Sequence, residues 1–246
     1  AYNTRYRMLD YEEVVAVNQF TLDKALEISL PCYVGHPYIF NEDSLSRYLE
    51  VIAKKAPAGI SLLYPERYYG LNEPLLEFIS FPEKFGLKSV VHEMKLVSGF
   101  NGELIDWPID LIKDALSLDN VVAIKEDSKN DAIAEIVLEE CLKRGIACVL
   151  AGGGKKRALN FVGKGLDTWL NGSTMFFPQV IDKIYPAIMQ GDKQVVDFYC
   201  ERIETPFFDE IAAKHGWHLA HKAALEYFGF SERWERFPHP VIPKKS

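Results

Sequence analysis

The sequence predicts an α/β protein whose parallel strands form a (β/α)8 barrel, and three observations support this prediction. Short apolar stretches typical of buried strands alternate with amphipathic helical stretches along most of the chain. The alternation gives one leading helix, six strand–helix units and a helical C-terminal stretch. Neither a Gly-x-Gly-x-x-Gly pattern nor a phosphate-binding loop is present to suggest an open nucleotide-binding sheet. Because the first helix has no strand before it, we expect a barrel that the chain enters partway round.

Local signals place the individual elements. Asp10 caps a predicted helix over 9–30, and the polar residues from Asn41 open a second helix. Pro108 fits the first turn of a further helix, and Gly145 ends the helix over 131–144. The predicted strands are 30–35, 58–64, 89–93, 121–125, 146–150 and 166–170, and the other predicted helices cover 73–81, 156–162 and 177–190. We expect a barrel domain over 1–190 and a C-terminal helical extension, packed on the barrel, over 191–246.

The composition excludes several classes of protein. Hydrophobic residues make up 48% and charged residues 26% of the chain, as in ordinary globular proteins. A net charge of −7 argues against nucleic acid or an anionic membrane as partner, but it leaves an anionic small substrate open. No apolar run approaches the roughly 20 residues of a membrane span, and the polar start lacks the apolar core of a signal peptide. With four scattered cysteines and no Cys-x-x-Cys pair, we expect a reduced, cytoplasmic protein without disulfides or structural zinc.

Lys125 is the leading candidate for chemistry. It follows Val121–Ile124, four apolar residues that predict a strand buried on both faces. The carboxyl ends of such strands carry the active sites of α/β barrels. A buried lysine is unfavourable unless it is paired or neutral, and a neutral ε-amine attacks carbonyl groups to form a Schiff base. The alternative is a lysine that extends past the sheet into water.

The segment Val122–Ser128 resembles the Schiff-base strand of the dihydrodipicolinate synthase/N-acetylneuraminate lyase family of class I aldolases. This resemblance implies that Lys125 forms the imine and that the chain holds strands three to eight of the family's barrel. A second resemblance is to the family's Pro-Tyr-Tyr segment, in which a tyrosine reaches the neighbouring subunit's site. Here Tyr64–Pro65 is followed by Tyr68 and Tyr69, with two residues inserted. Further similar segments are 150–153, where Gly152 and its neighbour replace aspartates, the glycine-led strand 165–171, and the proline-rich ending 234–243.

Two departures from the family pattern affect the predicted site. The family's first strand–helix–strand has no counterpart in this sequence; in the family it ends in the carboxylate-binding Gly-x-Thr/Ser-Gly-Glu loop. Because a barrel without two strands has open edges, we expect a partial chain lacking roughly 50 residues. His92 stands where the family has its proton-relaying tyrosine, and a histidine is a competent acid and base near neutral pH. Glu93 points to the opposite face from His92 if the strand continues. Val97 replaces an arginine that binds a second carboxylate, which argues against dihydrodipicolinate synthesis itself.

Three further groups are weaker candidates. His215, His218 and His221 could suggest a metal site, but their spacing spreads them around a helix that Gly216 weakens, so a surface or packing role is favoured. The basic stretch 155–157 could bind an anion at a helix start or simply be solvated. Thr168 could hydrogen-bond a substrate hydroxyl if its side chain faces inward.

The sequence therefore predicts a lyase in which Lys125 condenses with a 2-oxo acid such as pyruvate or a sugar-derived 2-keto acid. His92 would move the proton, helped by Tyr68 or Tyr69, with Glu93, Gly152 and Thr168 as substrate-binding candidates. The resemblance implies a homo-oligomer, a dimer or tetramer, and no metal or organic cofactor. Aldolase and sugar-acid dehydratase chemistry both stay open, as does a catalytically silent protein that binds a 2-oxo acid. A metal-dependent class II aldolase would need a ligand cluster that the sequence does not show.

Overall fold

The computed structural model describes residues 9–35, 41–63, 72–94, 99–100, 103–104, 106–151 and 154–235. By its internal contacts the chain divides into two compact units, Ala1–Ala151 and Gly152–Ser246. The predicted division near residue 190 stays a prediction. The two units are described in turn.

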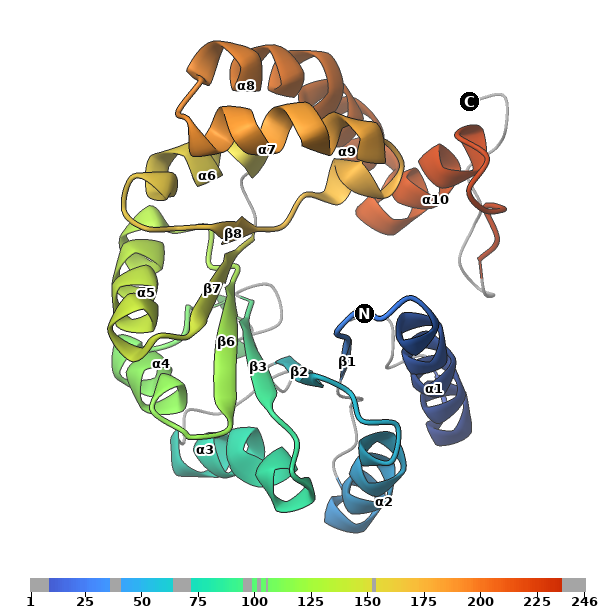
Figure 1. Cartoon of the computed structure of the whole chain (residues 1–246), viewed down its shortest axis with the longest axis vertical. Helices are drawn as coiled ribbons and strands as arrows, with labels where there is room; N and C mark the ends of the chain where they lie inside the picture. The colour runs from blue at the N-terminus through green and yellow to red at the C-terminus, as the bar shows by residue number, and fades with distance from the viewer. Residues whose placement is uncertain are drawn as a thin grey trace. The chain divides into compact units, whose positions relative to one another are not determined.

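The first unit is a curved parallel sheet with its helices on the outer side (Figure 1). Its neighbouring strands follow the order of the chain, and all of them pair in parallel. They are β1 (Tyr33–Gly35), β2 (Gly59–Leu63), β3 (Ser89–Glu93), β6 (Val121–Glu126) and β7 (Ala147–Leu150). The helices are α1 (Tyr11–Glu27), α2 (Glu42–Ala53), α3 (Asn72–Ser80), α4 (Ile109–Leu116) and α5 (Asp131–Arg144), with a 3-10 turn, Phe81–Phe85, after α3. The predicted alternation is confirmed here, with boundaries that differ by a few residues.

Capping residues account for several helix boundaries. Asp10 accepts a hydrogen bond from the backbone of Glu13, whose side chain accepts one in return from Asp10, so that a capping box starts α1. Asn130 accepts a hydrogen bond from the amide of Ala132 at the start of α5. At the other end of α5, Gly145 has a φ of 66°, a left-handed conformation that glycine adopts without steric cost.

A short hairpin interrupts the strand–helix alternation after β3. Its two strands, β4 (Gly99–Phe100) and β5 (Glu103–Leu104), are antiparallel. Residues 101–102, between these two strands, lie outside the described residues. Pro108 then stands directly before α4, and its fixed φ suits a helix start.

The second unit is mainly helical. It contains α6 (Gly154–Val162), the short strand β8 (Thr168–Trp169), α7 (Ile181–Met189), α8 (Lys193–Tyr199), α9 (Ala213–His215) and α10 (Trp217–Tyr227), with 3-10 turns at Gly172–Met175 and Pro178–Val180 and π-helical stretches at Cys200–Glu204 and Pro206–Ala212. The predicted strand over 166–170 is thus only two residues long. The predicted helix over 177–190 begins at Ile181, because Phe177 precedes a proline and has a non-helical backbone, with a φ of −135° and a ψ of 64°. None of the helices in the described ranges combines the length and the apolar character that a membrane crossing requires.

Aromatic side chains form the centre of the second unit. Phe176, Phe207, Ala212 and Ala220 are buried together. His221 packs among them, with its ring 4.8 Å from that of Phe207 and its Nδ1 2.7 Å from the carbonyl oxygen of Trp217. This packing agrees with the role favoured for His221 from the sequence. Within the described parts of the chain, no group of three or more His, Cys, Asp or Glu side chains is arranged to hold a metal ion.

Candidate active site

The pairing of β3 with β6 places His92 beside Lys125. The two residues are Cα partners across the parallel pair, and Glu93 is in the same way the partner of Glu126. Both pairs lie at the carboxyl ends of their strands. Because side chains alternate between the faces of a strand, His92 and Lys125 share one face, and Glu93 and Glu126 share the other.

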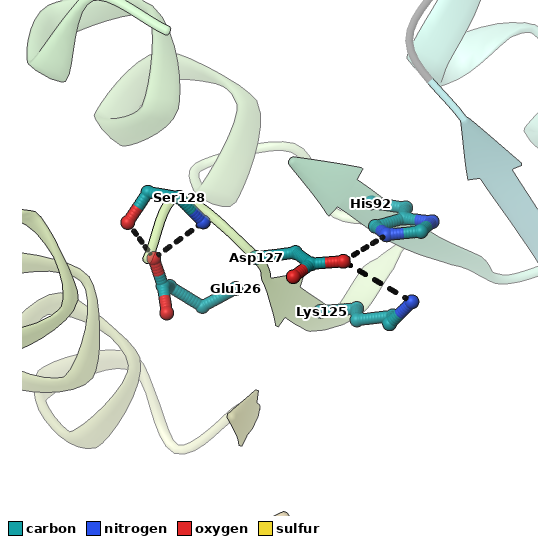
Figure 2. A network of polar contacts seen from close by, with 5 residues as sticks. All are labelled: His92, Lys125, Glu126, Asp127 and Ser128. Carbon is teal, nitrogen blue, oxygen red and sulfur yellow. Dashed lines mark hydrogen bonds and ion pairs between the residues drawn. The ribbon is translucent and has the colours of Figure 1, made fainter. Parts of the chain in front are cut away.

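Asp127 joins His92 and Lys125 into one polar cluster. Its Oδ2 lies 3.4 Å from Nε2 of His92 and 3.7 Å from Nζ of Lys125 (Figure 2). The three side chains differ in their access to solvent: 24% of the Lys125 side chain is exposed, 11% of Asp127 and only 1% of His92. A molecule arriving from solvent therefore meets the amine and the carboxylate, with the imidazole behind them.

Burial and neighbouring charges control the protonation of this cluster. Burial lowers the pKa of Lys125, and the negative charge of Asp127 only partly opposes this effect. Burial by itself would raise the pKa of Asp127, but the hydrogen bond from His92 and the charge of Lys125 bring it below its ordinary value. Asp127 is thus a carboxylate over the ordinary pH range, and the amine of Lys125 loses its proton more readily than an exposed lysine.

His92 is a neutral imidazole at neutral pH. Burial lowers its pKa to about 4, although the hydrogen bond with Asp127 acts in the opposite direction. A carboxylate can only accept hydrogen bonds, so Nε2 of His92 carries the ring proton and donates it to Asp127. The other ring nitrogen points away from Asp127 (Figure 2).

A second polar cluster lies on the opposite face of the same two strands. Glu126 is fully buried and accepts hydrogen bonds from the backbone amide of Ser128, at 3.0 Å, and from its hydroxyl. Glu93 is 1% exposed. Burial raises the pKa of Glu93 to about 7, together with the charges of Glu126 and Asp106; the backbone amides of Asp127 and Trp107 lower it by less. Glu93 is therefore about half protonated at neutral pH and largely protonated below it.

Comparison with solved structures identifies the fold. A dihydrodipicolinate synthase from Bacteroides thetaiotaomicron matches with a TM-score of 0.78 and 16% identity, over 96% of this chain and 78% of that one. The enzyme of the same name from Bacillus clausii matches with a TM-score of 0.77 and 16% identity, over 98% and 78% of the two chains. This chain has the dihydrodipicolinate synthase fold. No family model and no curated protein matches the sequence.

A third similar structure is YagE, a prophage protein of the dihydrodipicolinic acid synthase family from E. coli K12, determined in complex with pyruvate. It matches with a TM-score of 0.75 and 16% identity, over 96% of this chain and 78% of that one. The resemblance seen in the sequence thus extends to the fold, which is that of an α/β barrel. The expected loss of the first strand–helix–strand stays a prediction.

The dihydrodipicolinate synthase fold brings together some of the predicted site residues. Lys125 and His92 are neighbours, as expected. Glu93 lies on the face opposite them, and its predicted contact with the substrate stays a prediction. Tyr68, Tyr69 and Gly152 lie outside the described residues, so that their roles stay predictions.

Two residues of the second unit were also singled out from the sequence. Thr168 lies in β8, where its hydroxyl donates a hydrogen bond to the Asp167 carboxylate at 2.8 Å; its proposed contact with a substrate hydroxyl stays a prediction. Arg157 is 6% exposed and its guanidinium lies 5.9 Å from the Phe161 ring, so this member of the basic stretch is not solvated.

Asp127 is a site residue for which the sequence predicted no role. The period of two along a strand could have indicated one, since Asp127 follows Lys125 by two residues and an extended backbone would put both on the same face. The strand ends at Glu126, however, and the orientation of a residue beyond a strand end is not fixed by that period.

Proposed function

We propose that the protein is a lyase that forms a Schiff base between Lys125 and a 2-oxo acid. The observation that carries this proposal is the position of the Lys125 amine, at the end of a buried parallel strand and 3.7 Å from a carboxylate. Burial lowers the pKa of this amine, which raises the fraction present as the nucleophilic neutral form. The 24% exposure of the side chain leaves it accessible to a small substrate.

The chemistry follows from the imine. The amine attacks the keto carbon and water leaves, which gives a protonated imine that accepts electrons from a neighbouring bond. Cleavage of a C–C bond, its formation, or loss of water can each follow. The Asp127 carboxylate, which is hydrogen-bonded to His92, lies beside the amine and can hold and move protons there.

The likeness in fold supports a 2-oxo acid as substrate, because YagE was determined in complex with pyruvate. Pyruvate and longer 2-keto acids are therefore the compounds to test first. A cytoplasmic location and a homo-oligomeric state stay predictions. One similar structure is described as a monomeric dihydrodipicolinate synthase variant, which shows that this fold does not require an oligomer.

Trapping of the imine tests the proposal. The protein is incubated with pyruvate or a longer 2-keto acid, reduced with borohydride and digested, and the mass of the Lys125 peptide is measured. We expect a stable adduct on Lys125 that is absent from Lys125→Ala. Lys143→Ala, which removes an exposed lysine on α5, is the matched control and should give the wild-type adduct.

The outcomes separate the candidate functions. An adduct on Lys125, followed by consumption of the acid in the presence of aldehydes or by loss of water from sugar acids, identifies a lyase. An adduct without any turnover favours the catalytically silent 2-oxo-acid-binding protein. The absence of an adduct with every acid tested would overturn Schiff-base chemistry.

A further inference from the structure

The Lys125 amine needs a partner that can take up and return protons while the imine forms. Two groups lie near it, the carboxylate of Asp127 and the imidazole of His92, which are themselves 3.4 Å apart. The sequence suggested His92 for this role. The geometry distinguishes the group that exchanges protons with the amine from the group that holds it in position.

We propose that Asp127 is the catalytic acid and base of imine formation, and that His92 is a positioning residue that holds the Asp127 carboxylate beside Lys125. This inference rests on the proposed Schiff-base function and names a residue of the same site. It stands on the location of Oδ2 of Asp127 between Nζ of Lys125 and Nε2 of His92 (Figure 2).

Access to the reacting atoms favours Asp127. The Asp127 side chain is 11% exposed and its oxygen lies 3.7 Å from Nζ, where a carbonyl substrate must approach. The His92 side chain is 1% exposed, and a group buried to this degree does not meet a substrate from solvent. Asp127 is therefore the member of the pair that can touch both the amine and the substrate oxygen.

The protonation state of His92 also favours Asp127 as the group that exchanges protons. Its Nε2 already carries a proton and donates it to Asp127, so this nitrogen has no lone pair with which to accept a proton relayed by the carboxylate. Burial keeps the imidazole neutral by lowering its pKa to about 4. A neutral donor of this kind orients a carboxylate without taking its proton.

One carboxylate suffices for a balanced reaction. The Asp127 carboxylate takes a proton from the Lys125 ammonium, and the free amine attacks the carbonyl carbon, so that a C–N bond forms and the carbonyl oxygen becomes an alkoxide. Asp127 gives its proton to this alkoxide. It then takes a second proton from the new nitrogen cation and gives it to the hydroxyl, whose C–O bond breaks as water leaves. An ammonium and a ketone have become an iminium and water, and Asp127 is again a carboxylate beside the cation.

Rapid-quench trapping with pyruvate and borohydride tests the division of roles by measuring the rate at which the Lys125 adduct appears. Asp127→Asn keeps the shape of the side chain but cannot exchange a proton, and we expect the rate to fall by at least about 100-fold, as general acid–base catalysis predicts. His92→Gln places an amide N–H where Nε2 donates. We expect it to stay within about tenfold of wild type, because a donor to Asp127 is retained.

A conservative variant and a pH profile separate catalysis from structure. Asp127→Glu should recover part of the rate, because it restores a carboxylate. The pH profile of trapping should keep its shape in His92→Gln and change its shape in Asp127→Asn, where the rate should follow the deprotonation of the Lys125 amine alone. Unfolding curves of each variant show that the compared proteins are folded.

Each outcome decides a different question. If His92→Gln traps more slowly than Asp127→Asn, or Asp127→Asn traps at the wild-type rate, the assignment of Asp127 is overturned while an adduct on Lys125 still supports the proposed function. If the wild-type protein forms no adduct with pyruvate or longer 2-keto acids, the proposed function is overturned, and the role of Asp127 with it.

Discussion

The two faces of the β3–β6 pair carry different polar groups, although adjacent residues of each strand supply them. On one face His92 and Lys125 meet Asp127, and the cluster combines an imidazole, an amine and a carboxylate. On the other face Glu93 pairs in register with Glu126, and the cluster is acidic. Burial acts alike on both faces, since it opposes charge wherever it acts.

The difference between the faces lies in the partners. Asp127 has a lysine and an imidazole N–H within 4 Å, and these hold its pKa below the ordinary value. Glu93 has the carboxylates of Glu126 and Asp106 near it, and its pKa rises to about 7. Asp127 keeps its charge because a lysine faces it, whereas Glu93 faces carboxylates, which favour its neutral form.

The largest effect that we expect comes from the face that carries Glu93 and Glu126, the acidic face, and is a loss of stability at high pH. The pKa of Glu93 is raised from 4.5 to about 7, so the folded protein binds one proton more than the unfolded chain between these values. The free energy of unfolding of wild type, measured against Glu93→Gln, should therefore fall by about 2 to 3 kcal/mol between about pH 5 and pH 8.5. Chemical denaturation at both pH values measures this difference.

Glu139→Gln is the control for Glu93→Gln, because Glu139 forms an exposed ion pair with Lys143 on α5. It should leave the pH dependence of stability close to that of wild type. If Glu93→Gln behaves like this control, Glu93 is ionised in the folded protein and the contrast between the faces is wrong.

We expect the opposite pH dependence of stability from His92, on the other face, and a smaller change in the free energy of unfolding. The pKa of His92 is lowered from 6.5 to about 4, so the unfolded chain binds the extra proton and acid favours unfolding. Wild type should lose about 2 kcal/mol relative to His92→Gln between about pH 7.5 and pH 5. Urea denaturation at the two pH values measures the loss. Equal changes in both proteins would show that folding does not lower the pKa of His92.

The smallest effect concerns the Ser128 hydroxyl, which donates to Glu126 on the acidic face. Ser128→Ala removes this donor but leaves the backbone amide as a second donor, so we expect a loss of about 1 kcal/mol in the free energy of unfolding. Denaturant titration measures the loss, with the exposed Ser117→Ala as control. A fall in the trapping rate as large as that of Asp127→Asn would show that the two faces do not act separately.

Much of the fold could be predicted because its signals are local. The Asp10 capping box, the glycine that ends α5 and the apolar strand before Lys125 are all visible in the sequence, and the strand–helix alternation dictates a parallel sheet. Boundaries in the second unit were less predictable, because Pro178 and the π-helical stretches interrupt the helical pattern.

The sequence by itself determined that Lys125 ends a buried strand and that His92 and Glu93 face opposite sides of their own strand. Only the tertiary structure decided which of the two stands beside Lys125, because register between strands depends on pairing over the whole sheet. It likewise decided the role of Asp127, whose carboxylate reaches Lys125, two positions away in the chain, and His92, 35 positions away. Contacts of this range arise from packing, which no local pattern encodes.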